Sequence, residues 1–347
     1  MICALREKCA AAGFDLCDPI HTRWYNDIIE EEGHVEKGTL QKISEPPAIS
    51  EGTGDGEGLH YNAVLIGNSK SIWPKFIAWL TSQYEKRLEK NGDHCDKDEI
   101  FDQVLNENPF DTFVTETLSQ VFQLCCSVPT EGGVASQLSS YEFYWSNGVH
   151  YKVDLDDITH GTESAHRTNG NYHCYASQKS SFLVSMQRVA KATGEYWHDD
   201  EGTKLCVHPK FGTWKAFRAV VVFHKMQKAE EPQLSIPKAP PLCPCPVAAQ
   251  DIQKAKEVMD YALKMSAGEN GDHSGYGGSS TYANLCTYLH NSVTSGSDWS
   301  KVSPTMRPWI QLRDCISLGR EDYKYCDNQL LYHYTKDPEI LKREIKR

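Results

Sequence analysis

The chain has 347 residues, of which 39% are hydrophobic, and carries a formal net charge of −11. The length allows one large domain or two ordinary ones, and the apolar content is sufficient for a packed core. An acidic chain lacks the basic surface that nucleic-acid binding requires, and no apolar run reaches the length of a membrane span. We therefore expect neither a nucleic acid nor a membrane as a partner.

The N-terminus and the cysteines favour a reducing, cytoplasmic environment. Charged residues at positions 6–8 come too early for a secretory signal. The cysteine count, 13, is odd, and neither Cys125-Cys126 nor Cys243-Pro244-Cys245 has the spacing of a CxxC metal pair. We expect free thiols, with neither a disulfide scaffold nor a protein-held metal.

Hydrophobic periodicity predicts helices and strands in an irregular order. The segment 13–19 is predicted as a turn. Strands are predicted over 61–67 and 216–224, and a hairpin over 141–155 with Asn147-Gly148 at its turn. Helices are predicted over 20–32, 73–90, 182–197 and 251–265, after Pro109, and at the basic C-terminus. Because no regular βαβ repeat occurs, the pattern favours an α+β fold with a mostly antiparallel sheet.

Polar and glycine-rich stretches interrupt these elements and divide the chain. Residues 33–58, 156–172 and 266–297 are predicted as loop insertions, and 230–246 as a proline-rich connector. The glycines at 52–58 lack the flanking strand and helix of a dinucleotide-binding motif. We expect a core domain over 1–235 and, over 236–347, the connector followed by a helical cap that completes a cavity.

Arg218 lies in a strand whose other residues are almost all apolar, Ala216-Phe217-Arg218-Ala219-Val220-Val221-Val222. A guanidinium in such surroundings needs a carboxylate or phosphate partner, because an unpaired buried charge is costly. Two interpretations remain open. The partner is either an acidic side chain of the protein or an anionic ligand.

The segment leading into this strand, Cys206-Val207-His208-Pro209-Lys210-Phe211-Gly212-Thr213-Trp214-Lys215-Ala216-Phe217-Arg218, resembles a motif of the CblC protein family. That family is also called cyanocobalamin reductase/alkylcobalamin dealkylase. Weaker matches occur in the same order along the chain, at 13–15, 24–26, 189–190, 313–317 and 325–332. The resemblance therefore spans most of the chain, from about residue 13 to 338.

The resemblance implies a nitroreductase-like flavoprotein fold, with an antiparallel sheet and helices around a large cavity. Cobalamin would bind there with its base detached from cobalt, and the corrin, not the protein, would hold the metal. Glutathione thiolate would remove an alkyl upper ligand, whereas FMN or FAD with NADPH would supply the electrons for decyanation. The side chains would bind and orient the reactants, and none would act as a catalytic acid, base or nucleophile.

The family's binding residues transfer onto matching positions of this chain. Arg218 and Arg313 match arginines that hold the carboxylates of glutathione, and Arg343 is a candidate for a third. The positions matching cobalamin contacts are Ser181, Phe182, Leu183, Val184, Tyr196, Trp197, Thr203, Cys206, Trp214 and Phe217.

Two departures from the family pattern stand out. Relatives carry Ser-Gly two residues before the motif cysteine, where this chain has Thr203-Lys204. A helix position that is histidine in a known family member is Arg188 here. The resemblance also implies a downstream cobalamin-trafficking protein and a flavoprotein reductase as partners, and a monomer or weak homodimer.

Two alternatives to a dealkylating and decyanating enzyme remain. One is a cobalamin chaperone with little turnover, and the other is a flavin-dependent oxidoreductase of the same fold that does not bind cobalamin. The Asp-x-His-x-x-Gly loop, in which histidine ligates cobalt, is missing from the sequence. A Gly-x-Ser-x-Gly hydrolase motif is missing as well.

Overall fold

A computed structural model describes residues 2–45, 61–91, 96–105, 108–126, 140–154, 183–224, 239–266 and 299–346. The chain divides into two compact units, each assembled from segments far apart in sequence. The first, which we call the sheet unit, comprises Met1–Asn68, Val114–His198 and Ala216–Pro244. The second, the helical unit, comprises Ser69–Phe113, Asp199–Lys215 and Cys245–Arg347.

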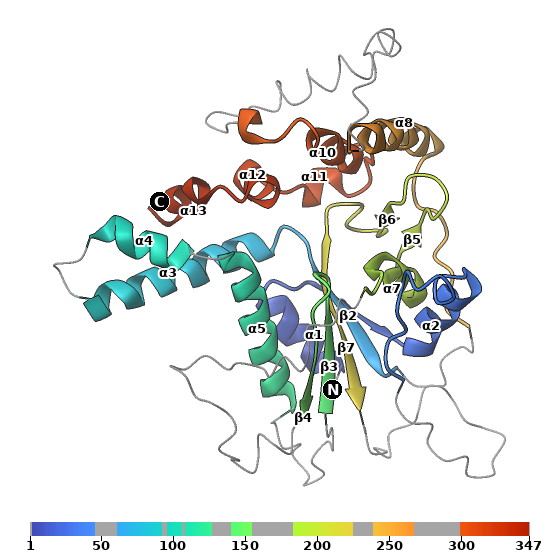
Figure 1. Ribbon diagram of the computed structural model, residues 1–347, viewed down its shortest axis with the longest axis horizontal. Helices are drawn as coiled ribbons and strands as arrows, with labels where there is room; N and C mark the ends of the chain where they lie inside the picture. Colours follow the sequence, from blue (N-terminus) through green and yellow to red (C-terminus); the bar gives the residue numbers. More distant parts are fainter. Residues whose placement is uncertain are drawn as a thin grey trace. The chain divides into compact units, whose positions relative to one another are not determined.

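The sheet unit is built on a five-stranded sheet in the order β1-β2-β7-β3-β4, with every neighbouring pair antiparallel (Figure 1). This confirms the antiparallel sheet expected from the sequence. Residues 219–223 of the central strand are buried, as β-branched and aromatic side chains favour. The strands are β1 (Leu16–Ile20), β2 (Ala63–Asn68), β3 (Ser140–Trp145), β4 (His150–Asp154) and β7 (Ala216–His224).

The hairpin of β3 and β4 has the predicted Asn-Gly turn. Gly148 adopts φ +81°, which glycine tolerates at little cost. The Asn147 side chain accepts a hydrogen bond from the Val149 amide at 3.2 Å. Alternating side chains divide between the two faces of the sheet. Phe143 shares one face with Tyr141, Trp145 and Tyr151, which we call the aromatic face, whereas Tyr144 lies on the other face with Glu142 and His150.

Helices pack around this sheet and bury its aromatic face. Phe122 of α5 lies 5.2 Å from the Phe143 ring and 6.1 Å from the Phe223 ring. The helix α7 begins where the Ser185 side chain caps the Arg188 amide and ends at Gly194, with φ +76°. The helices are α1 (Ile2–Ala11), α2 (Thr22–Glu31), α7 (Met186–Thr193) and, from Val114 onward, α5 (Pro109–Cys126).

Two local predictions for the sheet unit were wrong. The segment predicted as a turn contains β1, which is an edge strand. Proline, which has no N–H group, is tolerated in an edge strand because one side of that strand has no neighbouring strand to donate to. The helix predicted over 182–197 is shorter, because Ser185 and Gly194 cap it. Leu183 and Val184 therefore precede the helix, and Trp197 lies in the short strand β5 (Trp197–His198).

The helical unit has its own aromatic core. The Phe76 ring lies 5.0 Å from Phe110, 5.6 Å from Phe113 and 6.0 Å from Tyr332. The unit also contains β6 (Cys206–Val207) and the helix over 97–105, which the sequence analysis did not predict. Its helices are α3 (Ile72–Asn91), α4 (Lys97–Leu105), the start of α5, α8 (Ala249–Ser266), η2 (Trp299–Lys301), α10 (Arg307–Asp314), α11 (Arg320–Tyr323), α12 (Asp327–Thr335) and α13 (Pro338–Ile345).

The predicted insertions fall mostly outside the described residues: 46–58, 156–172 and 267–297 lie there, and residues 33–45 form turns and an extended segment. The proposed boundary at residue 235 and the nitroreductase-like classification both remain predictions. Among the described helices, none combines the length and apolar character needed to cross a bilayer.

Candidate functional site

The motif that follows β6 forms a tight turn in the helical unit. His208 and Gly212 exchange backbone hydrogen bonds of 3.1 and 2.8 Å, and the His208 ring accepts one from the Lys210 amide. Gly212 adopts φ +56°, and a Cβ atom there would lie 1.9 Å from the Leu318 carbonyl oxygen. The motif therefore requires glycine for two reasons, its backbone conformation and the close approach of the chain near 318.

Arg313, in the second matching segment, bonds directly to the first. Its Nε and Nη2 donate to the Thr213 carbonyl at 3.2 and 3.0 Å, and Nη2 also donates to the Lys215 carbonyl at 3.2 Å. In return, the Thr213 hydroxyl donates to the Arg313 carbonyl at 2.6 Å. The guanidinium lies between two rings, 4.9 Å from Trp214 and 4.8 Å from Tyr325.

The rest of the second segment is also engaged within the helical unit. Asp314, 5% exposed, pairs with Lys324 at 3.1 Å. Ser317 donates from its amide and its hydroxyl to the Asp251 carboxylate at 2.9 and 2.6 Å. Within the 313–317 segment, Arg313 is therefore bonded to the motif turn and Ser317 to α8.

Three predicted cobalamin residues are buried in the helical unit. Cys206 is buried and its carbonyl accepts a hydrogen bond from the buried Lys215 ammonium at 2.6 Å. Thr203 is buried and donates through its amide and hydroxyl to Asp199, at 2.7 and 3.0 Å. Burial raises the pKa of Asp199, but hydrogen bonds from Thr203 and Gly202 outweigh it and lower the pKa below its ordinary range. Trp214, the third, is fully buried.

Arg218 lies near the start of β7, where the strand is half-buried. Its Nε donates to the side-chain oxygen of Asn68 at 2.6 Å, so that a neutral amide orients the guanidinium. Asn68 ends β2 just after a break in the strand register at Ile66/Gly67. Asn68 was not predicted as a site residue. Its position directly after the buried strand predicted over 61–67 was the one sequence feature that could have indicated it.

Phe217 and Tyr196, which the resemblance implies as separate cobalamin contacts, pack against each other in the sheet unit. Their rings form an edge-to-face pair with centroids 5.4 Å apart. The Tyr196 hydroxyl donates to Asp18 at 2.5 Å, and its side chain is 1% exposed, whereas Phe217 is half-buried. Of this pair, Phe217 offers more surface to a ligand.

The other predicted residues differ in exposure. Leu183 is 59% exposed, and Val184 and Trp197 are half-buried, so all three are accessible. Arg343 is exposed on α13. Ser181 and Phe182 lie outside the described residues.

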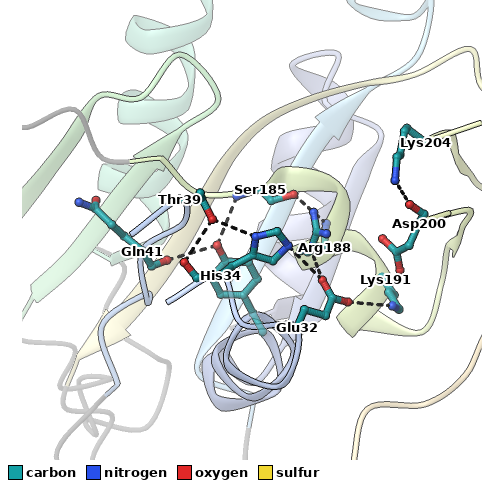
Figure 2. Close-up of polar contacts among 10 residues, drawn as sticks. Glu32, His34, Thr39, Gln41, Ser185, Arg188, Lys191, Asp200 and Lys204 are labelled. Atoms are coloured by element: carbon teal, nitrogen blue, oxygen red, sulfur yellow. Dashed lines mark hydrogen bonds and ion pairs between the residues drawn. The ribbon is translucent and has the colours of Figure 1, made fainter. Parts of the chain in front are cut away.

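A charged cluster around Glu32 links α2 to α7, and sequence reasoning did not identify it. Figure 2 shows the Glu32 carboxylate accepting from Arg188 Nε at 2.5 Å and Lys191 Nζ at 3.4 Å. The His34 ring lies 3.5 Å from the same carboxylate. The residue that departs from the family pattern, Arg188, therefore has an acidic partner within the sheet unit.

A second cluster surrounds Glu142, whose side chain is 12% exposed. Tyr144 and Ser44 donate to it at 2.8 Å each, and His150 and His224 lie at 3.3 and 3.2 Å. Burial raises the pKa of Glu142, but hydrogen bonds from these four side chains outweigh it and hold the pKa far below its ordinary range. The cluster fixes the segment around Ser44 on the sheet. Within the described ranges, no three His, Cys, Asp or Glu side chains are grouped so that they could hold a metal ion.

No family model matches the chain, and no curated protein matches it. Among solved structures, the crystal structure of a C. elegans B12-trafficking protein, CblC, is similar with a TM-score of 0.47 and 14% identity. The alignment covers 99% of this chain and 95% of that one.

Proposed function

We propose that this protein binds cobalamin and removes its upper axial ligand with glutathione. The observation that carries the proposal is the bonding between the two segments that resemble CblC motifs. Residues 206–218 and 313–317 are about 100 positions apart, yet Thr213 and Arg313 exchange hydrogen bonds. Two unrelated chance matches have no reason to fold against each other, whereas two parts of one inherited site do.

The chemistry we propose is a nucleophilic displacement on an alkylcobalamin. The glutathione thiolate forms a bond to the alkyl carbon, and the electron pair of the cobalt–carbon bond remains on the metal. The products are a thioether and reduced cobalamin. The protein contributes alignment of the sulfur with the carbon, which accounts for a large part of a displacement barrier.

Arg218 is the residue we propose to bind a glutathione carboxylate. Guanidinium–carboxylate pairs are directional and often bidentate, and the Asn68 amide holds the orientation of this guanidinium through Nε. A positive charge near the ligand also favours the thiolate over the thiol. Arg343, exposed on α13, remains the candidate for a further carboxylate contact.

For the corrin, the accessible side chains are the better candidates. Leu183, Val184, Trp197 and Phe217 each present surface, whereas Tyr196, Thr203, Cys206 and Trp214 are covered by the protein itself. We propose that the first group contacts cobalamin, as the resemblance also implies for Ser181 and Phe182. Cyanocobalamin would be decyanated in the same position, with electrons from FMN or FAD and NADPH.

An absorbance titration with methylcobalamin tests the proposal. We expect a shift to the base-off spectrum on binding, followed by a slower, glutathione-dependent change as the methyl group is lost. A shift without the second change would instead indicate a cobalamin chaperone. No shift at all would contradict cobalamin binding and leave the flavin oxidoreductase.

The Arg218→Ala variant makes the test specific. Hydrogen bonds to charged groups contribute about 1.5–3 kcal/mol, so we expect at least a tenfold rise in the glutathione KM, with cobalamin affinity nearly unchanged. Arg23→Ala is the matched control, since Arg23 is exposed on α2 and pairs with its helical neighbour Asp27. Equal loss of cobalamin and glutathione binding in folded Arg218→Ala would exclude the proposed role of Arg218.

A further inference from the structure

The hydrogen-bond donors of Arg313 are largely committed inside the helical unit. A guanidinium has five N–H donors in one plane. Nε–H donates to the Thr213 carbonyl, and Nη2 donates to the Thr213 and Lys215 carbonyls. Three of the five N–H groups are therefore used by the backbone of the motif.

The remaining geometry does not suit a carboxylate. Bidentate recognition needs two parallel N–H groups on one edge of the guanidinium, either Nε with Nη2 or Nη1 with Nη2. Both edges include Nη2, whose two bonds go to backbone carbonyls. The rings of Trp214 and Tyr325, at 4.9 and 4.8 Å, occupy positions beside the guanidinium as cation–π partners.

The electrostatic surroundings favour a permanently charged Arg313. Burial lowers the pKa of Arg313, but the phenol groups of Tyr325 and Tyr334 outweigh it and raise the pKa above its ordinary value. The charge is thus stabilised by tyrosines, indole and carbonyl oxygens of the helical unit itself. No external anion is needed to explain why an arginine stands at this position.

We infer that Arg313 is a positioning residue, which holds the backbone of Thr213–Lys215 and the Trp214 ring in place, and does not bind a glutathione carboxylate. The inference deepens the proposed function and rests on it for its kinetic test. It also assigns a different role to Arg313 than the resemblance implies. Asp314 and Ser317 have the same kind of positioning role, because each is bonded to another part of the helical unit.

The kinetic test compares two thiols, glutathione and 2-mercaptoethanol, which has no carboxylate. Misplacement by about 1 Å can cost on the order of 100-fold in rate, so Arg313→Ala and Arg313→Lys should lose activity with both thiols by a similar factor. Arg218→Ala provides the contrast, since it should lose activity selectively with glutathione. Selective loss with glutathione in the Arg313 variants would overturn the inference.

A second measurement needs no ligand and separates failure of this inference from failure of the proposed function. In hydrogen–deuterium exchange, the amides of residues 207–215 should exchange at least tenfold faster in Arg313→Lys than in the unmodified chain. Lysine keeps the charge but cannot form three coplanar hydrogen bonds. The same segment should be unaffected in Arg218→Lys. Unchanged exchange in Arg313→Lys would overturn the positioning role, whatever the outcome of the cobalamin titration.

Discussion

At the scale of single residues, Lys204 carries backbone strain. It adopts φ +56° immediately after the hydrogen-bonded turn that Asp199 forms with Thr203. Left-handed conformations cost side chains with a Cβ about 1–2 kcal/mol, and glycine escapes this cost. A glycine, which the family motif has at this position, would avoid that cost.

We expect Lys204→Gly to raise the free energy of unfolding by about 0.5–1 kcal/mol, because relief of the strain outweighs the added flexibility of glycine. Chemical denaturation of the two proteins measures the difference. Lys204→Ala is the control: it also removes the contact between the ammonium and the Asp200 carbonyl, but it keeps the Cβ. Stabilisation by alanine as large as that by glycine would show that the backbone conformation is not the cause.

Glu142 is a residue whose ionisation stabilises the fold. Its pKa is lowered by hydrogen bonds from His150, His224, Tyr144 and Ser44, which outweigh the opposite effect of burial. Below the ordinary value of 4.5, the unfolded chain binds a proton that the folded chain does not. The contribution of Glu142 to the free energy of unfolding is therefore fully present above about pH 4.5. Below that pH it decreases progressively as the solution becomes more acidic.

The Glu142→Gln substitution removes this charge while nearly preserving shape. We expect a loss of about 2 kcal/mol at neutral pH, since charge-assisted hydrogen bonds contribute about 1.5–3 kcal/mol. The difference between the two proteins should shrink as the pH falls below 4.5. Denaturation measured from pH 7 to pH 3 checks both expectations, and a difference that stays constant over this range would contradict the linkage.

At the scale of elements, an ion pair between Arg188 and Glu32 links α7 to the end of α2. Arg188 Nε lies 2.5 Å from Glu32, and the two side chains are 20% and 27% exposed. A double-mutant cycle with Arg188→Ala and Glu32→Ala should give a coupling energy of about 1 kcal/mol. The Arg23–Asp27 pair, at 3.6 Å with exposures of 60% and 49%, should give about 0.3–0.5 kcal/mol. Equal coupling energies would mean that partial burial does not strengthen the Arg188–Glu32 ion pair.

The elements that sequence reasoning predicted well are those with a strong local signal. β7 and the β3–β4 hairpin follow from β-branched runs and from Asn147-Gly148, and α3 follows from its helical periodicity. β1 was missed because Asp18 and Pro19 resemble a turn when the neighbouring strand is unknown. The carboxylate clusters at Glu32 and Glu142 could not be predicted either. Each depends on partners more than 80 residues away in sequence: Arg188 and Lys191 for Glu32, Ser44 and His224 for Glu142.

The site shows the same division between local and long-range information. The resemblance implied that Arg218 and Arg313 bind glutathione and that Phe217 and Tyr196 contact cobalamin, and these roles stay predictions. It could not indicate that Arg313 donates to the Thr213 and Lys215 carbonyls. That contact depends on how two segments meet, and no pattern within either segment encodes it.

At the scale of the whole molecule, the helical unit takes Asp199–Lys215 from the middle of the chain and Cys245–Arg347 from its end. The sequence analysis instead proposed a boundary at residue 235, with 1–235 as a core domain. The two divisions differ in what they predict for a chain truncated there. Truncation would remove Arg313, Leu318 and Tyr325, all of which contact the segment around Trp214.

We expect the 1–235 fragment to retain its sheet but to lose order over 199–215, because that segment would lose the partners that bury it. Trypsin provides the measurement, since Lys215 is only 8% exposed in the full chain. Cleavage after Lys215 should be rapid in the fragment and slow in the full chain. Cleavage after Lys152, on the exposed side of β4, is the control and should be similar in both. A fragment that protects Lys215 as well as the full chain does would favour the boundary at residue 235, because the segment's order would then not depend on the C-terminal helices.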